Sequence, residues 1–264
     1  MASRIALRSV ALAYLGAILL VPVAVVLYKT LEPGLMSVFD SVTTPAAVSA
    51  FWLTITVTAI AVPLNAVLGV LTAMALVRGR LPGKKIVEAI IDLPFAISPV
   101  VIGLALVLLY GREGWFGGEL ASAGIQILFS FPGIVLATVF VTLPFVVREV
   151  APVLREVGDE QEQAAATLGA SRLQAFRMIT LPAIRWGLVY GVVLSVARAI
   201  GEFGAVSVVS GKVSGETETL TLLVEKRFTN FDLAGAYAAS TLLAVIALVT
   251  LGFMVLVNRR KELS

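Results

Sequence analysis

The sequence contains no cysteine and no histidine, and charged residues make up only 14% of its 264 positions. Without cysteine the chain has no disulfide and no thiolate metal or redox site. Histidine is the commonest general base and the commonest metal ligand, so its absence removes both. An enzyme is therefore an unfavourable hypothesis, and we expect a non-catalytic chain that binds no cofactor or metal of its own.

The chain is instead rich in long apolar stretches, with 59% hydrophobic residues and a mean hydropathy of +0.99. A soluble domain has roughly 25% charged residues, so this composition indicates an integral membrane protein. A spanning helix needs about 20 mostly apolar residues. Six stretches qualify: 10–28, one within 41–77 that we expect to begin near Trp52, 86–110, 131–147, 186–209 and 233–257. We expect a single all-α transmembrane domain over residues 1–264.

The basic residues are distributed unevenly between the two sides of this arrangement. Most lysines and arginines fall on the side that holds the N-terminus, including Arg4, Arg8 and the 259–261 cluster. Cytoplasmic loops carry such an excess, so we expect both termini to be cytoplasmic in a multi-pass protein of the cell membrane. The apolar run of the first stretch is longer than that of a signal peptide, so we expect it to be retained.

The longest cytoplasmic loop, 158–182, lies between the fourth and fifth stretches and reads as two short helices. Asp159 with Glu162 resembles a capping box and predicts a first helix over 160–168. Gly169 is suited to the left-handed conformation that closes a helix.

A second cap-like pair, Ser171 with Gln174, predicts a helix over 172–180. We expect Leu181 to end it, because a residue before proline avoids the helical region, and Pro182 to open the next helix. Neither short helix is long enough to be stable in water alone. Their apolar side chains need a covering surface, which is either another protein or the rest of this chain.

The spacing of this loop resembles the signature of permease subunits of ABC importers. That signature is Glu-Ala-Ala, three residues, Gly, nine residues, Ile, one residue, Leu-Pro. The matching positions are Ala164, Ala165, Gly169, Ile179, Leu181 and Pro182. The glutamate position holds Gln163, with Glu162 beside it, so it is open which of the two faces a partner.

The resemblance implies a type I importer permease whose coupling helices dock on a separate ATPase subunit, where ATP and magnesium bind. Carried over to this chain, the docking residues are Glu162, Gln163, Ala164, Ala165, Leu168, Gly169, Ala170, Ser171 and Phe176. A phosphate-binding loop of the form G-x-x-x-x-G-K-[ST] is absent from the sequence. The ATPase is therefore expected on another chain.

Ionisable residues inside a span are costly and point to function. In the fifth stretch Arg198 and Glu202 stand four residues apart, so one helix face carries both and they can pair. Two interpretations stay open: a structural ion pair, or an arginine that helps an anion cross while Glu202 positions it. Gly201 and Gly204 leave room for close helix contact or for solute passage.

The third stretch contains Asp92, Pro94 and Pro99. Two prolines five residues apart are expected to kink or unwind this helix, which a membrane tolerates only where protein or a cavity satisfies the freed backbone groups. Asp92 is expected near the cytoplasmic interface. It is either a structural cap of the broken helix or a pathway residue.

Three segments give a finer resemblance: DLPFAISPVVIGLAL (92–106), FVTLPFVVREV (140–150) and ARAIGEFGAV (197–206). They are similar to the oxyanion branch of these permeases, and nearest to CysW-type sulfate permease subunits. The resemblance implies import of sulfate or thiosulfate by alternating access. It also implies a second homologous permease, two ATPase copies and an extracytoplasmic sulfate-binding protein. Molybdate or tungstate import stays open, as do a homodimer and an ATP-independent secondary transporter.

Overall fold

The computed structural model describes residues 2–79 and 82–262, and within these ranges it consists of helices and connecting loops without strands. The described residues contain five helices long and apolar enough to cross a membrane. These are α1 (Ala2–Leu31), α3 (Pro45–Val77), α7 (Phe131–Val157), α10 (Leu181–Ile200) and α13 (Leu233–Glu262). The bent pair α4 (Lys84–Ala96) and α5 (Pro99–Tyr110) makes a sixth when taken as one span. The all-α prediction with about six spans is confirmed.

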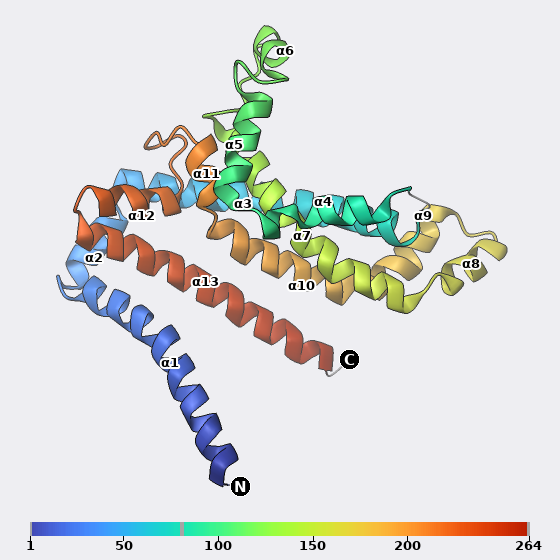
Figure 1. Cartoon of the computed structure of the whole chain (residues 1–264), viewed down its shortest axis with the longest axis horizontal. Helices are drawn as coiled ribbons and strands as arrows, with labels where there is room; N and C mark the ends of the chain where they lie inside the picture. The colour runs from blue at the N-terminus through green and yellow to red at the C-terminus, as the bar shows by residue number, and fades with distance from the viewer. Residues whose placement is uncertain (1, 80–81, 263–264) are drawn as a thin grey trace.

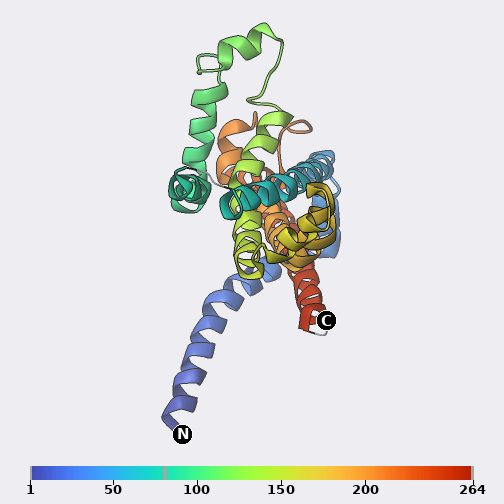
Figure 2. The ribbon, with the colours of Figure 1, turned by 90° about the vertical axis from the view of Figure 1, so that its right-hand side faces the viewer.

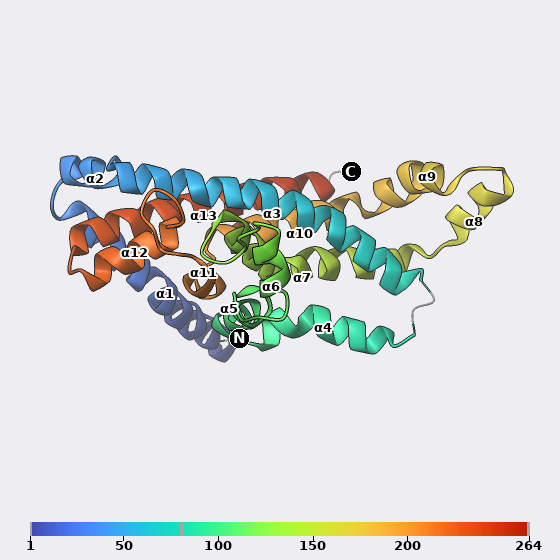
Figure 3. The same cartoon turned by 90° about the horizontal axis from the view of Figure 1, so that it is seen from above.

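Short helices connect the long ones. They are α2 (Leu35–Val42), α6 (Gly117–Ser122), α8 (Glu160–Thr167), α9 (Arg172–Ala175), α11 (Gly204–Val209) and α12 (Leu220–Thr229). Figure 1 shows α8 and α9 at one end of the long axis, and α2 and α12 at the other. Seen from above, α8 and α9 extend past the other helices (Figure 3). The predicted coupling loop is therefore a projecting part of the molecule.

The centre of the bundle is formed where α3, α7 and α10 cross. Val146 on α7 is fully buried between Gly69 of α3 and Gly191 of α10. A methyl group added at Gly69 would lie 2.6 Å from Val146 Cβ, and one at Gly191 would lie 2.8 Å from Val146 Cα. Both glycines are thus required by the closeness of the helices. The surrounding apolar cluster is Val70, Ala73, Leu76, Val147, Val150, Ala151, Leu154 and Ile184.

A buried polar network joins the same three helices. Asn65 is fully buried, and its Nδ2 donates to Thr142 Oγ1 at 2.6 Å and to the Val139 carbonyl at 3.1 Å. Ser195 Oγ donates to the Thr142 carbonyl at 3.3 Å. These bonds fix the relative register of α3, α7 and α10 in an interior where water offers no alternative partner.

The end of the bundle that holds α2 and α12 is tied together by Arg227. Its guanidinium donates to the carbonyls of Ser41 and Gly235 and to Thr44 Oγ1, at 2.9 to 3.0 Å. This one side chain joins α12 to the start of α3 and the start of α13. The first helix is attached more loosely: α1 leaves the bundle (Figure 2), and Thr30 near its end bonds Thr241 on α13 at 2.7 Å.

Two predicted spans are not continuous helices. The third turns by 116° between α4 and α5, so the expected disruption by the prolines is confirmed. The break lies at Ile97 and Ser98, which are extended, because the residue before Pro99 avoids the helical region. The fifth prediction, 186–209, is wrong as one helix: α10 ends at Ile200 and α11 begins only at Gly204.

The boundaries of two other spans also differ from the prediction. The second helix begins at Pro45 rather than near Trp52, because Thr44 caps it with a side-chain bond to Ala47 N and proline suits its first turn. The fourth continues ten residues beyond Val147 to Val157. Arg148 and Arg155 in that extension pair with Asp92 and Glu88 of α4.

Candidate functional site

The coupling loop has the predicted helix, glycine corner and second helix. Gly169 lies in the left-handed region with φ +89°. Ala170 N donates to the Ala165 carbonyl and Gly169 N to the Ala166 carbonyl, both at 3.0 Å, which is the Schellman closure of α8. Ser171 and Gln174 form the predicted capping box reciprocally at the start of α9. The corner is thus closed by backbone bonds on the α8 side and by side-chain caps on the α9 side.

Two local predictions in this loop are wrong. The capping box is not formed: Asp159 makes no side-chain cap, and the Glu162 carboxylate accepts from Arg78 and Thr180 instead. The second helix does not end at Leu181: residues 176–180 form a π-helical turn that runs directly into α10. Pro182 does occupy the first turn of α10, as predicted, where its missing N–H and ring are accommodated.

The predicted docking residues divide by exposure. Gln163, Ala164, Leu168, Gly169 and Ser171 are exposed, and Leu168 is 89% exposed. Ala165 and Ala170 are half-buried in the Schellman corner, as is Glu162 beneath it. Phe176 is half-buried and packs on the core cluster around Val146. None of the exposed members carries a formal charge, and Leu168 presents an apolar side chain among them.

The two ionisable residues of the fifth stretch are paired as predicted. Arg198 Nη1 lies 2.6 Å from Glu202 Oε2, near the end of α10. The glutamate side chain is 1% exposed and the arginine side chain 29%. Glu202 Oε1 also accepts from Ala205 N at 2.8 Å and so caps α11. The geometry therefore buries the carboxylate as an anchor and leaves the guanidinium partly open.

The surroundings of Glu202 are rich in hydroxyl groups. A cavity of about 10 Å³ beside it is lined by residues that include Thr54, Thr138 and Thr219. That volume is about the size of one water molecule. Thr221 Oγ1 donates to the Glu202 carbonyl at 2.8 Å. The broken segment between α10 and α11 thus has its freed polar groups satisfied by neighbouring helices, as a membrane interior requires.

Two of the glycines named with this pair have different surroundings. A methyl group at Gly204 would lie 2.8 Å from Pro99 Cβ, so the start of α11 touches the start of α5. The structure therefore brings together two pathway candidates from distant segments. Gly201 is exposed, and the nearest atom to an added methyl group is 3.7 Å away. Gly204 serves close packing, whereas Gly201 borders open space.

Asp92 lies apart from these residues and pairs with α7. Its Oδ1 accepts from Arg148 Nε at 2.9 Å, and Arg148 also stacks over the Phe95 ring at 4.4 Å. One turn away Arg155 donates to Glu88 at 2.7 Å. The interpretation of Asp92 as a helix cap is wrong, since the break is five residues further on. Pro94 stays buried inside α4.

Both α4–α7 ion pairs are exposed, with the Asp92 and Arg148 side chains 44% and 55% accessible. Exposed pairs contribute about 0–1 kcal/mol to stability. We expect Asp92→Asn to lower the unfolding free energy by less than about 1 kcal/mol, because asparagine still accepts from Arg148. Thermal unfolding in detergent measures this, with Glu88→Gln as the matched control. A loss above about 2 kcal/mol would show that Asp92 supports the fold.

Residues 65–263 match the model of the family described as binding-protein-dependent transport system inner membrane component. The sulfate transport system permease protein CysW of Synechocystis sp. is 49% identical over 254 residues, which are 96% of this chain and 92% of that protein. CysW of Escherichia coli K12 is 47% identical over 93% of this chain and 84% of its own length. The chain belongs to this permease family.

Solved structures agree with this permease assignment at the level of the fold. A bacterial ABC transporter involved in the import of alginate superposes with a TM-score of 0.79 over 97% of this permease and 94% of that chain, at 18% identity. The same kind of transporter in complex with an alginate-bound periplasmic protein gives a TM-score of 0.75, also at 18% identity. The permease therefore has the fold of ABC importer membrane subunits.

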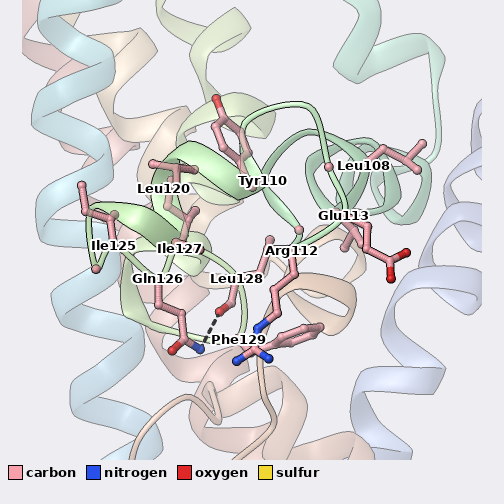
Figure 4. A pocket seen from close by; sticks show the side chains of 16 residues that line it. Leu108, Tyr110, Arg112, Glu113, Leu120, Ile125, Gln126, Ile127, Leu128 and Phe129 are labelled. Atoms are coloured by element: carbon pink, nitrogen blue, oxygen red, sulfur yellow. Dashed lines mark hydrogen bonds between the residues drawn. The ribbon is translucent and has the colours of Figure 1, made fainter.

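Another cavity in the described part of this permease lies away from the predicted sites. It measures about 860 Å³ and is lined entirely by residues between Val107 and Phe129, around α6. Figure 4 shows Arg112 and Phe129 on its rim and the bond from Gln126 Nε2 to the Leu128 carbonyl at 3.1 Å. The cavity is open, and one outer segment supplies its whole wall, so we do not place the pathway there.

The sequence alone did not identify three residues that lie in the coupling loop or contact it. Met178 is 77% exposed on the π-helical turn, because the wider turn changes the helical phase. Arg78 and Thr180 both contact Glu162, and Arg78 is 84 positions away from it. The position of Arg78 just after an apolar span can be read from the sequence, but its pairing with Glu162 cannot.

Proposed function

We propose that this permease is the membrane subunit of an ATP-driven sulfate importer. The observation that carries the proposal is the 49% identity to a sulfate permease protein over 96% of this chain. The chain is also similar to a differently named sulfate transport system permease protein, CysT. CysT of Salmonella typhimurium is 39% identical over 89% of this chain. The similarity to both kinds of relative, CysW and CysT, supports a pairing of this chain with a second, homologous permease.

The coupling loop provides the attachment for the ATPase. Gln163, Ala164, Leu168 and Gly169 form an exposed surface without a formal charge on a projecting pair of helices. Such a surface suits a cleft on a soluble subunit that binds ATP and magnesium. This chain is then non-catalytic: closure of two ATPase copies moves the coupling loop, and the spans alternate between outward and inward openings.

The position of the coupling loop sets the orientation of the chain and the side on which a binding protein would dock. With the coupling loop in the cytoplasm both termini are cytoplasmic too, and the end that holds α2 and α12 is extracytoplasmic. A sulfate-binding protein delivers its ligand there. Arg198 offers a partly exposed cation to the dianion, and buried Glu202 holds that cation in place. Selectivity rests mainly on the binding protein, so the membrane site can be weak.

The function is tested by uptake of labelled sulfate into cells that lack their own sulfate importers. The chain is expressed alone and then with its genomic neighbours, and molybdate is added as a competitor. Uptake that requires an ATPase and a second permease, and resists a modest molybdate excess, supports the proposal. Uptake by the chain alone contradicts an ATP-driven importer. Strong competition by molybdate would identify molybdate, rather than sulfate, as the substrate.

The docking surface is tested at its corner. We expect Gly169→Asp to abolish substrate-stimulated ATP turnover in an assembled membrane protein, because it places a charge and a strained left-handed residue in the middle of the apolar tip. Gly34→Asp is the matched control: Gly34 has φ +94° and, like Gly169, open space where a side chain would go, but it lies between α1 and α2. Full ATP turnover in Gly169→Asp would refute docking through this corner.

A further inference from the structure

The Glu162 carboxylate joins the coupling loop to two spans. Its Oε1 accepts from Arg78 Nη2 at 3.1 Å and from Thr180 Oγ1 at 2.6 Å. Arg78 caps the end of α3, and Thr180 is the last residue of the π-helical turn that leads into α10. We name these three residues the Glu162 link. A single oxygen atom thus connects α8, α3 and α10.

The Glu162 link is shielded from water. Thr180 is 2% exposed, and the side chains of Arg78 and Glu162 are 17% and 23% exposed. Hydrogen bonds between charged groups are about twice as strong as neutral ones, and shielding reduces the competition from water. Arg78 Nε is buried without a hydrogen-bond partner. The positive charge of the Arg78 guanidinium is therefore compensated mainly by the Glu162 carboxylate.

The apolar side chains of α8 do not replace this attachment. No residue of α8 is fully buried, and its exposed side faces away from the bundle. A force applied to that side reaches the rest of the molecule along the chain into α7 at Gly158, through the Schellman corner and through the Glu162 link. The link leads directly to α3 and α10, the two helices that pack around Val146 on α7. The π-helical turn beside it is a structure often found at functional sites.

We propose that Glu162 is a positioning residue that makes α3 and α10 follow the movement of the coupling loop. The partner ATPase then contacts Gln163 and the apolar tip, while Glu162 faces inward and transmits the displacement. This inference rests on the proposed function, because it needs an ATPase that moves α8. It gives the two neighbouring residues Glu162 and Gln163 separate roles.

The test uses the assembled transporter in liposomes and compares sulfate transported per ATP hydrolysed. Glu162→Ala is expected to assemble and hydrolyse ATP, while the transport-to-hydrolysis ratio falls by roughly tenfold, the size of an ordinary coupling effect. Glu162→Gln keeps an acceptor for Thr180 and is expected to lie between Glu162→Ala and the wild type. The reversed pair Glu162→Arg with Arg78→Glu is expected to recover most of the ratio. Gln163→Ala should instead lower ATP hydrolysis and sulfate transport together, because it weakens ATPase binding.

Two results would overturn the inference. One is an unchanged transport-to-hydrolysis ratio in Glu162→Ala. The other is failure of both Glu162→Ala and the reversed pair to assemble, which would make the link structural only. Hydrogen exchange of the same complexes gives a readout that needs no sulfate: Glu162→Ala should speed exchange in α8 and in 176–180. If the wild type transports no sulfate but the exchange changes as expected, the proposed function fails and the link stands.

Discussion

Replacing Arg198 by alanine and Glu202 by glutamine together is expected to reduce sulfate uptake to background while the transporter still assembles. The single change Arg198→Ala is a poorer test, because it leaves the buried Glu202 carboxylate uncompensated, which costs about 3–5 kcal/mol in buried pairs. The double variant removes both charges. Glutamine also keeps the oxygen that accepts from Ala205 N, so the cap of α11 survives.

A matched control for this variant is the ion pair between Glu218, which directly precedes α12, and Lys226 within α12. Glu218 is buried with a side chain 1% exposed, and it pairs with the partly exposed Lys226 at 2.9 Å. The double change Lys226→Ala with Glu218→Gln removes a buried pair of the same kind from outside α10. Labelled uptake and the yield of assembled complex are measured for both. Normal uptake in the Arg198 and Glu202 double variant would leave only the structural interpretation of that pair.

The second large effect is expected at the crossing of α3, α7 and α10. Gly191→Ala should lower the free energy of unfolding by about 1–3 kcal/mol, because the added methyl group meets Val146 Cα, and a backbone atom cannot rotate away. Gly69→Ala should cost a similar amount, since Val146 is β-branched and stiff at χ1. Thermal unfolding in detergent measures both changes.

The two glycines should also be coupled, because both face Val146. Once one methyl group has spread the helices, the second costs less, so the double variant is expected to be less destabilised than the sum of the single variants. Gly252→Ala in α13 is the control, since nothing lies within 4 Å of its added methyl group. A Gly191→Ala variant as stable as Gly252→Ala would show that the helices yield easily at this crossing.

The sequence predicts those parts of the fold that depend on local chemistry. Apolar length locates the spans, Pro99 locates the corner before α5, and Gly169 with the Ser171 capping box locates the coupling turn. The Arg198–Glu202 pair was also predictable, because its partners are four residues apart and the backbone there is nearly helical.

The parts that the sequence did not predict depend on contacts between distant segments. The break after Ile200 is stabilised by Glu202, which caps α11, and by Thr221 from another helix. Glu162 prefers Arg78 and Thr180 to the local cap at Asp159 because the bundle brings these groups together. Single-sequence patterns carry no information on such pairings, so helix ends and side-chain partners were wrong where tertiary bonds competed with local ones.

The loose attachment of α1 bears on the order in which the chain enters the membrane during synthesis. The apolar part of α1 has a mean hydropathy of 2.7, and none of its most apolar window is buried by the rest of the chain. Such a helix is stable in lipid on its own, as the first stage of membrane-protein folding requires. α5 and α11 have 12 and 6 residues, too few to cross a bilayer that needs about 20. We therefore expect insertion to start with α1, and the α5–α11 contact to form last, after α7 and α10 have entered the membrane.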